Sequence, residues 1–238
     1  MKKNIYGKYI TIVIIFLFAL VFVVKFAGQS ILRLYIEAGI GSCLKIPILC
    51  MTPQEEIINP AINKEYSLEL LPYDFPKMTI CLPKGFAVVQ EGIKKIYYKK
   101  RKYQHSGAVI YLLREEPNFF LNLFPQLNKQ GIIDDYEFIK RTMYVKLKDV
   151  KSLTDAFFVI MKGIFTPDLG EQKNVEMAQF RIADKKGFIN YTLSHSENYF
   201  DCNIIDAGNS FFKIYIKDKG ATLDLNKVLT IISTVKEL

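Results

Sequence analysis

The first pattern in this chain is an unbroken apolar run near its N-terminus. Residues 9–24 read YITIVIIFLFALVFVV and contain no charged residue, glycine or proline. Counted through Ala27, the segment has 19 residues, close to the roughly 20 that a helix needs to cross about 30 Å of hydrocarbon. Because no polar face interrupts it, a buried helix of a soluble domain is a poor alternative. The pattern predicts a transmembrane helix at residues 9–27.

Charges on either side of this run predict its orientation. Lys2, Lys3 and Lys8 precede it, whereas Arg33 and Lys45 are the only basic residues in the twenty after Ala27. Positive residues favour the cytoplasmic side, so residues 1–8 form a cytoplasmic tail and the rest is exported. A cleaved signal peptide is the alternative, but cleavage after Ala27 would place a lysine where a small residue is required. We therefore expect an uncleaved signal anchor.

A juxtamembrane segment is expected at residues 28–63. Its first part, SILRLYIEAGIG, has the spacing of a short amphipathic helix that ends at Gly39 or Gly41. Prolines at 47, 53 and 60 interrupt the remainder of the segment. This segment is more apolar than a linker, so we expect it to pack on the domain or to rest at the lipid surface.

Short extended segments open the domain predicted at residues 64–238. Residues 66–71 alternate as a strand and precede a turn at Pro72 and Pro76. Two further segments meet at a hinge, residues 83–85. Strands are expected at residues 94–98 and 108–114, joined by a polar hairpin loop, KKRKYQHSG.

Helical spacing then takes over. A helix at residues 118–129 must kink or split at Pro125, and a second opens at Asp134 and Asp135. The third, residues 152–165, has Ser152 as its N-cap. Its expected apolar stripe consists of Leu153, Phe157, Ile160, Met161 and Ile164.

Alternation returns in the last third of the chain. Four runs with turn residues between them predict an antiparallel meander, namely residues 175–183, 187–194, 199–206 and 211–217. An amphipathic helix at residues 223–235 closes the chain. Strands and helices are thus segregated, which indicates an α+β fold: a twisted antiparallel sheet packed by helices, preceded by one N-terminal transmembrane helix.

One short motif and the order of elements resemble a known family. The motif is Leu82-Pro83-Lys84-Gly85-Phe86-Ala87-Val88, and the meander ending FFKIYI and the helix LNKVLTIISTVK complete the pattern. Over residues 66–238 the chain resembles the PsbP-like superfamily. The resemblance implies a non-catalytic accessory domain that binds other proteins, and it carries over no catalytic residue. The helical insert at residues 118–165 is larger than that family's pattern.

Candidate chemistry in the domain is sparse. The chain has four cysteines and two histidines without zinc-ligand spacing, and no nucleophile or nucleotide-binding motif. We therefore expect no enzyme, no metal and no cofactor. His195, with Glu197 and Asp201 nearby, is interpreted as a solvated turn histidine rather than a general base.

In an exported domain Cys43 and Cys50 are candidates for a disulfide, with buried thiols as the alternative. A Cys81–Cys202 bridge is the weaker pairing.

The most unusual local feature is a basic segment at residues 94–102, KKIYYKKRK. Its cationic residues form the candidate anionic-surface site: Lys94, Lys95, Lys99, Lys100, Arg101 and Lys102. Anionic lipid or an acidic envelope polymer would suit it, while the alternative is a solvated hairpin whose charges protect a strand edge.

The charge balance and the sparse chemistry together decide the expected function. Apart from the anchor and its flanks, 28 basic residues face 24 acidic ones, so charge does not indicate nucleic acid as a partner. We expect a single-pass protein whose extracytoplasmic domain acts through protein contacts at the cell envelope. The alternative is a lipid- or polymer-binding domain.

Overall fold

The computed structural model describes residues 28–75, 78–94, 98–105, 108–166 and 174–237. They form a mixed α+β structure with helices on a large sheet. The α+β prediction is confirmed at this level. The predicted anchor at residues 9–27 and the cytoplasmic tail lie outside the described residues.

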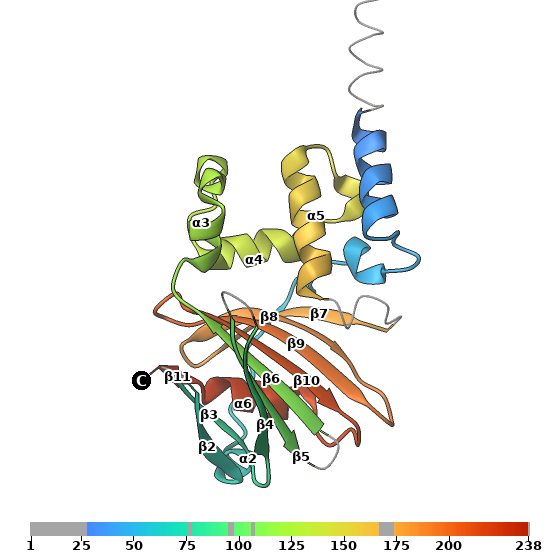
Figure 1. Ribbon diagram of the computed structural model, residues 1–238. Helices are drawn as coiled ribbons and strands as arrows, with labels where there is room; N and C mark the ends of the chain where they lie inside the picture. Colours follow the sequence, from blue (N-terminus) through green and yellow to red (C-terminus); the bar gives the residue numbers. More distant parts are fainter. Residues whose placement is uncertain (1–27, 76–77, 95–97, 106–107, 167–173, 238) are drawn as a thin grey trace, which may run out of the picture.

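An eight-stranded sheet organises the fold (Figure 1). Its order is β1-β7-β8-β9-β10-β6-β5-β4, and every described pairing is antiparallel except that of β1 with β7. The strands are β1 (Ile57–Ile58), β4 (Ala87–Lys94), β5 (Tyr98–His105), β6 (Ala108–Glu115), β7 (Glu176–Ile182), β8 (Lys185–Thr192), β9 (Asn198–Ile205) and β10 (Phe211–Asp218). The predicted meander is therefore present as β7 to β10.

One face of this sheet packs on the closing helix and a smaller sheet. Helix α6 (Leu225–Ser233) lies there with the strands β2 (Leu70–Phe75), β3 (Met78–Pro83) and β11 (Lys236–Glu237), in the order β11-β3-β2. The short helix α2 (Lys64–Leu68) contacts α6 at the end of the molecule opposite residue 28. Ile110 and Leu112 of β6 and Val228 and Ile232 of α6 belong to one buried cluster.

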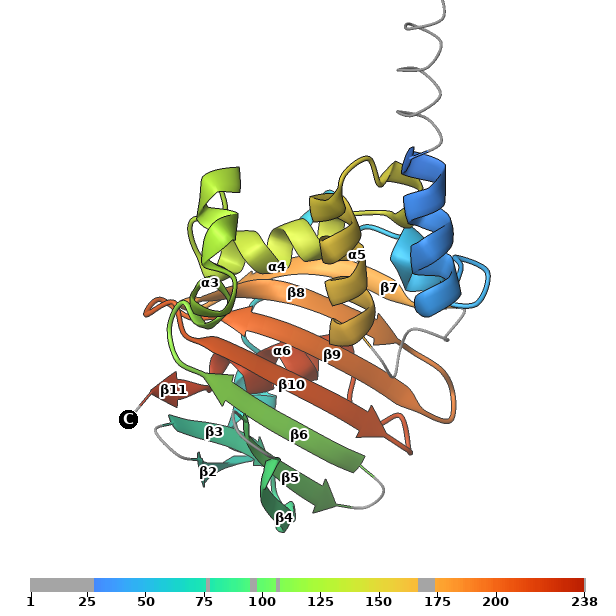
Figure 2. The same cartoon turned by 45° about the horizontal axis from the view of Figure 1, so that its top comes forward.

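The other face carries what we call the helical lobe, residues 28–50 and 119–165 (Figure 2). It contains a helix at residues 28–39, which we call the neck helix, and the described elements η1 (Pro47–Cys50), α3 (Phe119–Leu123), η2 (Pro125–Gln130), α4 (Asp135–Tyr144), η3 (Leu147–Asp149) and α5 (Leu153–Phe165). A second buried cluster joins this lobe to the sheet through Phe188, Ile205 and Phe211. The sheet thus separates two cores.

Local sequence explains most of the helix boundaries. Asp134, Ser152 and Asp224 each accept a hydrogen bond from the backbone N–H three residues later and cap α4, α5 and α6. The predicted split at Pro125 is confirmed, because α3 ends and η2 begins there. Helix α3 has no cap of its own, and the buried Asp135 side chain accepts from the N–H groups of Phe120 and Leu121 instead.

The strand predicted at residues 66–71 is wrong. Asn63 accepts a hydrogen bond from the Tyr66 N–H and starts α2, and the strand begins only at Leu70. Pro72, which was expected to make a turn, lies inside β2. Proline is tolerated there because β2 is the edge of the smaller sheet and needs no donor on its outer side.

The apolar stripe predicted for α5 is only partly correct, because Phe157 and Met161 are half-buried and pack on the lobe's core while the other members are not buried. Leu153 and Ile164 are exposed, whereas Ala156, Phe158, Val159, Lys162 and Phe165 are buried. The helix is apolar on nearly all sides, so periodicity alone did not select the face that packs. The buried face includes Lys162, whose contacts are described with the candidate site.

Candidate functional site

The segment at residues 28–58 is built into the helical lobe rather than linking to it. Ile36 of the neck helix and Ile48 and Leu49 of η1 are buried in the lobe's core. The segment approaches α5 at Gly163, where an added Cβ would lie 3.2 Å from the Ile40 Cγ2 atom. We call residues 28–58 the neck, and its packing fixes it to the domain.

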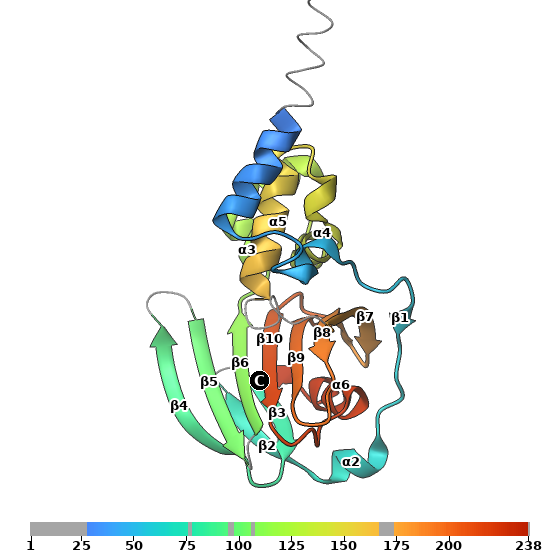
Figure 3. The same cartoon turned by 90° about the vertical axis from the view of Figure 1, so that its right-hand side faces the viewer.

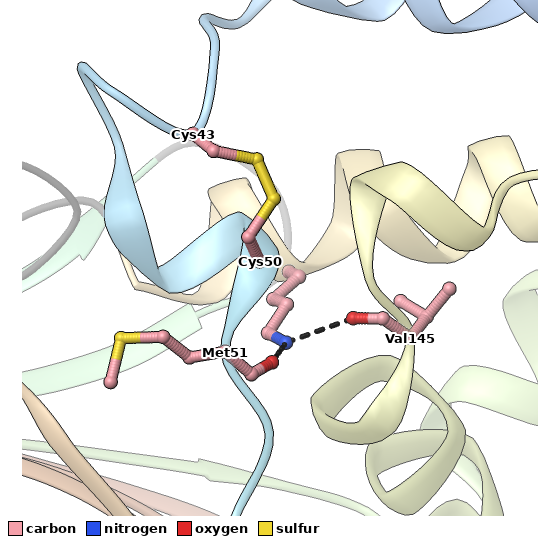
Figure 4. Close-up of a disulfide and its surroundings, with 5 residues drawn as sticks. Cys43, Cys50, Met51 and Val145 are labelled. Carbon is pink, nitrogen blue, oxygen red and sulfur yellow. Dashed lines mark hydrogen bonds between the residues drawn. A yellow bond between two sulfur atoms is a disulfide. The ribbon is translucent and has the colours of Figure 1, made fainter.

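A covalent link closes the middle of the neck (Figure 4). Cys43 and Cys50 are joined, with their Cα atoms 5.7 Å apart, within the range that a disulfide can bridge. The closed loop exposes Leu44, which is 95% accessible to solvent. The weaker pairing of Cys81 with Cys202 is wrong, because both thiols are free, although the two residues belong to the same hydrophobic cluster.

A buried lysine attaches the neck to α4 and α5. The Lys162 ammonium of α5 donates to the Met51 carbonyl at 2.7 Å, the Met143 carbonyl at 2.7 Å and the Val145 carbonyl at 2.9 Å. Three acceptors match the three hydrogens of an ammonium group. Burial, with a smaller effect of Lys146, lowers the pKa of Lys162 to about 7. We call this arrangement the lysine clamp.

The outer face of the neck is apolar and uncovered. Ile31, Leu34 and Tyr35 are exposed on the neck helix at positions i, i+3 and i+4, which lie on one face. Leu44, on the disulfide loop that follows, is exposed as well. We call these four residues the neck face. Exposed apolar residues gathered in this way are typical of interaction sites.

The basic segment does not form the hairpin loop that was expected. Lys94 ends β4, and Lys99, Lys100, Arg101 and Lys102 lie within β5. Strand β5 pairs with β4 on one side and β6 on the other, with Lys100 opposite Gly92 and Leu113. Lys95 lies outside the described residues, as do the side chains of the others.

Incorporation into a strand changes how the positions of this segment are arranged. Successive residues of a strand alternate between the two faces of the sheet, so positions 99 and 101 share one face while positions 100 and 102 share the other. The hairpin loop was predicted from polarity, which does not distinguish a loop from a charged strand.

His195 does not meet the two carboxylates near it in sequence. It is exposed and lines an open pocket of about 570 Å³ with Ser194 and Asn198. Glu197 accepts a hydrogen bond from the Tyr199 hydroxyl, and Asp201 is buried and paired with Lys213 at 2.7 Å. The arrangement does not provide a histidine oriented by a carboxylate.

A second open pocket of about 570 Å³ lies at the β7–β8 and β9–β10 turns. Two of its lysines are engaged: Lys185 pairs with Asp184 at 2.5 Å, and Lys186 lies 4.1 Å from the centroid of the Tyr136 ring. Within the described ranges no three His, Cys, Asp or Glu side chains are grouped so that they could hold a metal ion.

Two further findings concern membrane insertion and relatives. Among the residues that the structure describes, no helix combines the length and the hydrophobicity needed to cross a membrane. The chain matches no protein-family model and no curated protein.

Proposed function

We propose that this is a single-pass membrane protein whose extracytoplasmic domain acts through protein contacts, as an accessory or assembly factor at the cell envelope. Residues 9–27 are the signal anchor, residues 1–8 are cytoplasmic, and the domain is exported. The observation that carries the proposal is the neck: an apolar surface on a segment fixed to the domain.

The position of Leu44 favours a protein over lipid as the partner of the neck face. The neck helix has 12 described residues, 28–39, and at 1.5 Å per residue it extends about 18 Å. Leu44 comes after the far end of that helix. A headgroup layer is only about 5–8 Å thick, so a neck standing upright on the membrane presents Leu44 beyond it.

The rigidity of the neck supports the same proposal. A loop closed by a disulfide and clamped by Lys162 loses little conformational freedom when a partner binds it. Fixed packing also holds the domain at one height and orientation relative to residue 28, which an assembly factor acting on membrane neighbours requires. The resemblance to the PsbP-like superfamily suggests the same class of activity, and the proposal requires no catalytic group.

Site-specific photocrosslinking in native membranes tests this proposal. A benzoylphenylalanine probe replacing Leu44 should give one crosslinked product of discrete mass. The matched control is the same probe at Leu68, which is 87% exposed on α2 at the opposite end of the molecule. A product at position 44 that disappears in a Leu34→Ser, Tyr35→Ser background supports the neck face. Equal labelling at positions 44 and 68 contradicts it.

A second candidate function is binding of an acidic envelope polymer through the basic segment. The observation that favours it is the position of β4 and β5. Both strands belong to the sheet, and they lie far from residue 28 at the start of the neck helix (Figure 3). A soluble polyanion could reach strands at this place without contacting a membrane. Retention of the protein by immobilised acidic polymer, lost when Lys99, Lys100 and Arg101 are changed to Gln, is the corresponding test.

A further inference from the structure

The N-terminal end of α5 lies beside the neck helix, on the side where the chain enters the domain. The Arg33 Nε atom donates to the Val150 carbonyl at 3.2 Å, three residues before α5 begins. Figures 1 and 2 show that α5 runs from this end toward the sheet. The segment at residues 146–153 therefore lies next to the upper half of the neck helix.

We infer that this segment contacts the lipid headgroups of the membrane that holds the anchor, with Lys148, Lys151 and Leu153 as the contacting residues. The inference rests on the proposed function, because it needs residues 9–27 to span a bilayer. It concerns a surface separate from the neck face, and it names an anionic lipid surface as the ligand.

The short distance of this segment from the end of the apolar run, measured along the helix axis, supports this assignment. Arg33 is six residues past Ala27, so it lies at most about 9 Å further along a helix that rises 1.5 Å per residue. Val150 is held at that level by its hydrogen bond to Arg33. The headgroup region extends about 5–8 Å beyond the hydrocarbon, and lysine side chains are long enough to cover the remainder.

The chemistry of the segment suits a lipid surface. Leu153 is 79% exposed at the tip of α5, and Lys148 and Lys151 are exposed next to it. Asp155 is occupied by Arg141 at 2.9 Å and by Ser152 at 2.9 Å. Residues 146–153 contain three lysines, at 146, 148 and 151, and one acidic residue, Asp149, so the charge of the segment is positive. An exposed leucine that follows exposed lysines is the composition of interfacial membrane contacts.

A single tryptophan can measure the depth of this segment. The chain has no tryptophan, so Leu153→Trp gives the full-length protein in vesicles one unambiguous emitter. Leu68→Trp is the matched control, exposed on α2 at the far end. In vesicles of phosphatidylcholine and phosphatidylglycerol with brominated acyl chains, we expect Leu153→Trp to lose roughly half of its emission and to shift to the blue, as for a side chain 5–10 Å into the interface. Leu68→Trp should change in neither respect.

The outcomes separate this inference from the proposed function. If carbonate extracts the chain from membranes, the anchor is wrong and the inference fails with it. If the chain stays in the membrane but Leu153→Trp emits as Leu68→Trp does, only the headgroup contact is overturned. Charge gives a second readout: Lys148→Gln with Lys151→Gln should reduce the quenching of Leu153→Trp in phosphatidylglycerol vesicles, whereas Lys64→Gln with Lys84→Gln should not. Equal quenching in both pairs overturns the role of the lysines.

Discussion

The lysine clamp gives the most direct test of how the neck is held. Replacing Lys162 with Met keeps the length and apolar stem of the side chain but removes all three donors. The carbonyls of Met143 and Val145 then lose their partner in a buried site, and that of Met51 loses it in a partly buried one. The expected result is a destabilised protein in which the neck separates first.

Two opposing effects determine how much Lys162→Met changes the free energy of unfolding. An unsatisfied buried acceptor costs about 1–3 kcal/mol, so three of them cost about 3–9 kcal/mol. Methionine also relieves the burial of a charge: the pKa falls from 10.5 to about 7, and at about 1.4 kcal/mol per unit the relief is up to about 5 kcal/mol. Taking the middle of the first range, about 6 kcal/mol, we expect the loss to prevail by about 1 kcal/mol.

Denaturant unfolding of the full-length protein in detergent, followed by tyrosine near-ultraviolet circular dichroism, measures this difference. Lys140→Met is the matched control, because Lys140 is half-exposed and its ion pair with Glu137 at 3.3 Å contributes only a few tenths of a kcal/mol. Hydrogen exchange should accelerate at residues 46–52 in Lys162→Met and stay unchanged in β7 to β10. If Lys162→Met is as stable as Lys140→Met, the three hydrogen bonds do not hold the neck and the reasoning is refuted.

The disulfide, a close-packed glycine and the buried titratable groups each allow a further test. Thiol titration of the oxidised, unfolded chain should find two free thiols, and replacing Cys43 and Cys50 with Ser should cost about 2 kcal/mol for so short a loop; four free thiols would contradict the disulfide. Gly187→Ala should unfold the protein or lower its yield severely, because the new Cβ would lie 2.1 Å from the Asn203 carbonyl oxygen, whereas Gly39→Ala meets nothing within 4 Å and should be tolerated. Burial raises the pKa of Glu115 to about 7 and that of Asp135 to about 6, so the stability they contribute at low pH is lost as pH rises through 6–7. The lowered pKa of Lys162 acts in the opposite sense, since stability present above pH 10.5 is lost as pH falls toward 7; denaturation midpoints between pH 4 and 10 should therefore pass through a minimum near pH 7, and a flat profile would contradict it.

The elements that could be predicted from the sequence are those that local chemistry decides. The caps at Asp134 and Ser152, the split at Pro125 and the meander of β7 to β10 all depend on residues close together in the chain. Predictions failed where residues far away in the sequence determine the local structure or the burial of a side chain. Pro72 is strand because β2 has a vacant edge, and Lys162 is buried because three carbonyls from two other segments meet it.

The neck illustrates the same limit at the level of the site. The sequence suggested that residues 28–63 pack on the domain or rest on lipid, and it made Cys43 and Cys50 candidates for a disulfide, with buried thiols as the alternative. It offered no sign of the clamp, because a single lysine in an apolar helix resembles a solvated charge. The signal that could have found it is the position of Lys162 itself, on the same helical face as Phe158 and Phe165.

The place of the basic segment leads to one last prediction about lipid. Strands β4 and β5 lie on the sheet side of the helical lobe (Figure 3), and the neck helix alone separates the anchor from the sheet by about 18 Å. If residues 9–27 span a membrane as proposed, charges in β5 should interact little with that membrane, because at physiological salt the Debye length is about 8 Å. Changing Lys99, Lys100 and Arg101 to Gln in the full-length protein should therefore leave the quenching of Leu153→Trp by brominated lipid unchanged. The matched comparison is Lys148→Gln with Lys151→Gln, which should reduce it. A reduction by the β5 changes as large as that by the paired lysine changes would mean that the sheet lies on the membrane, and the upright arrangement of the neck would be wrong.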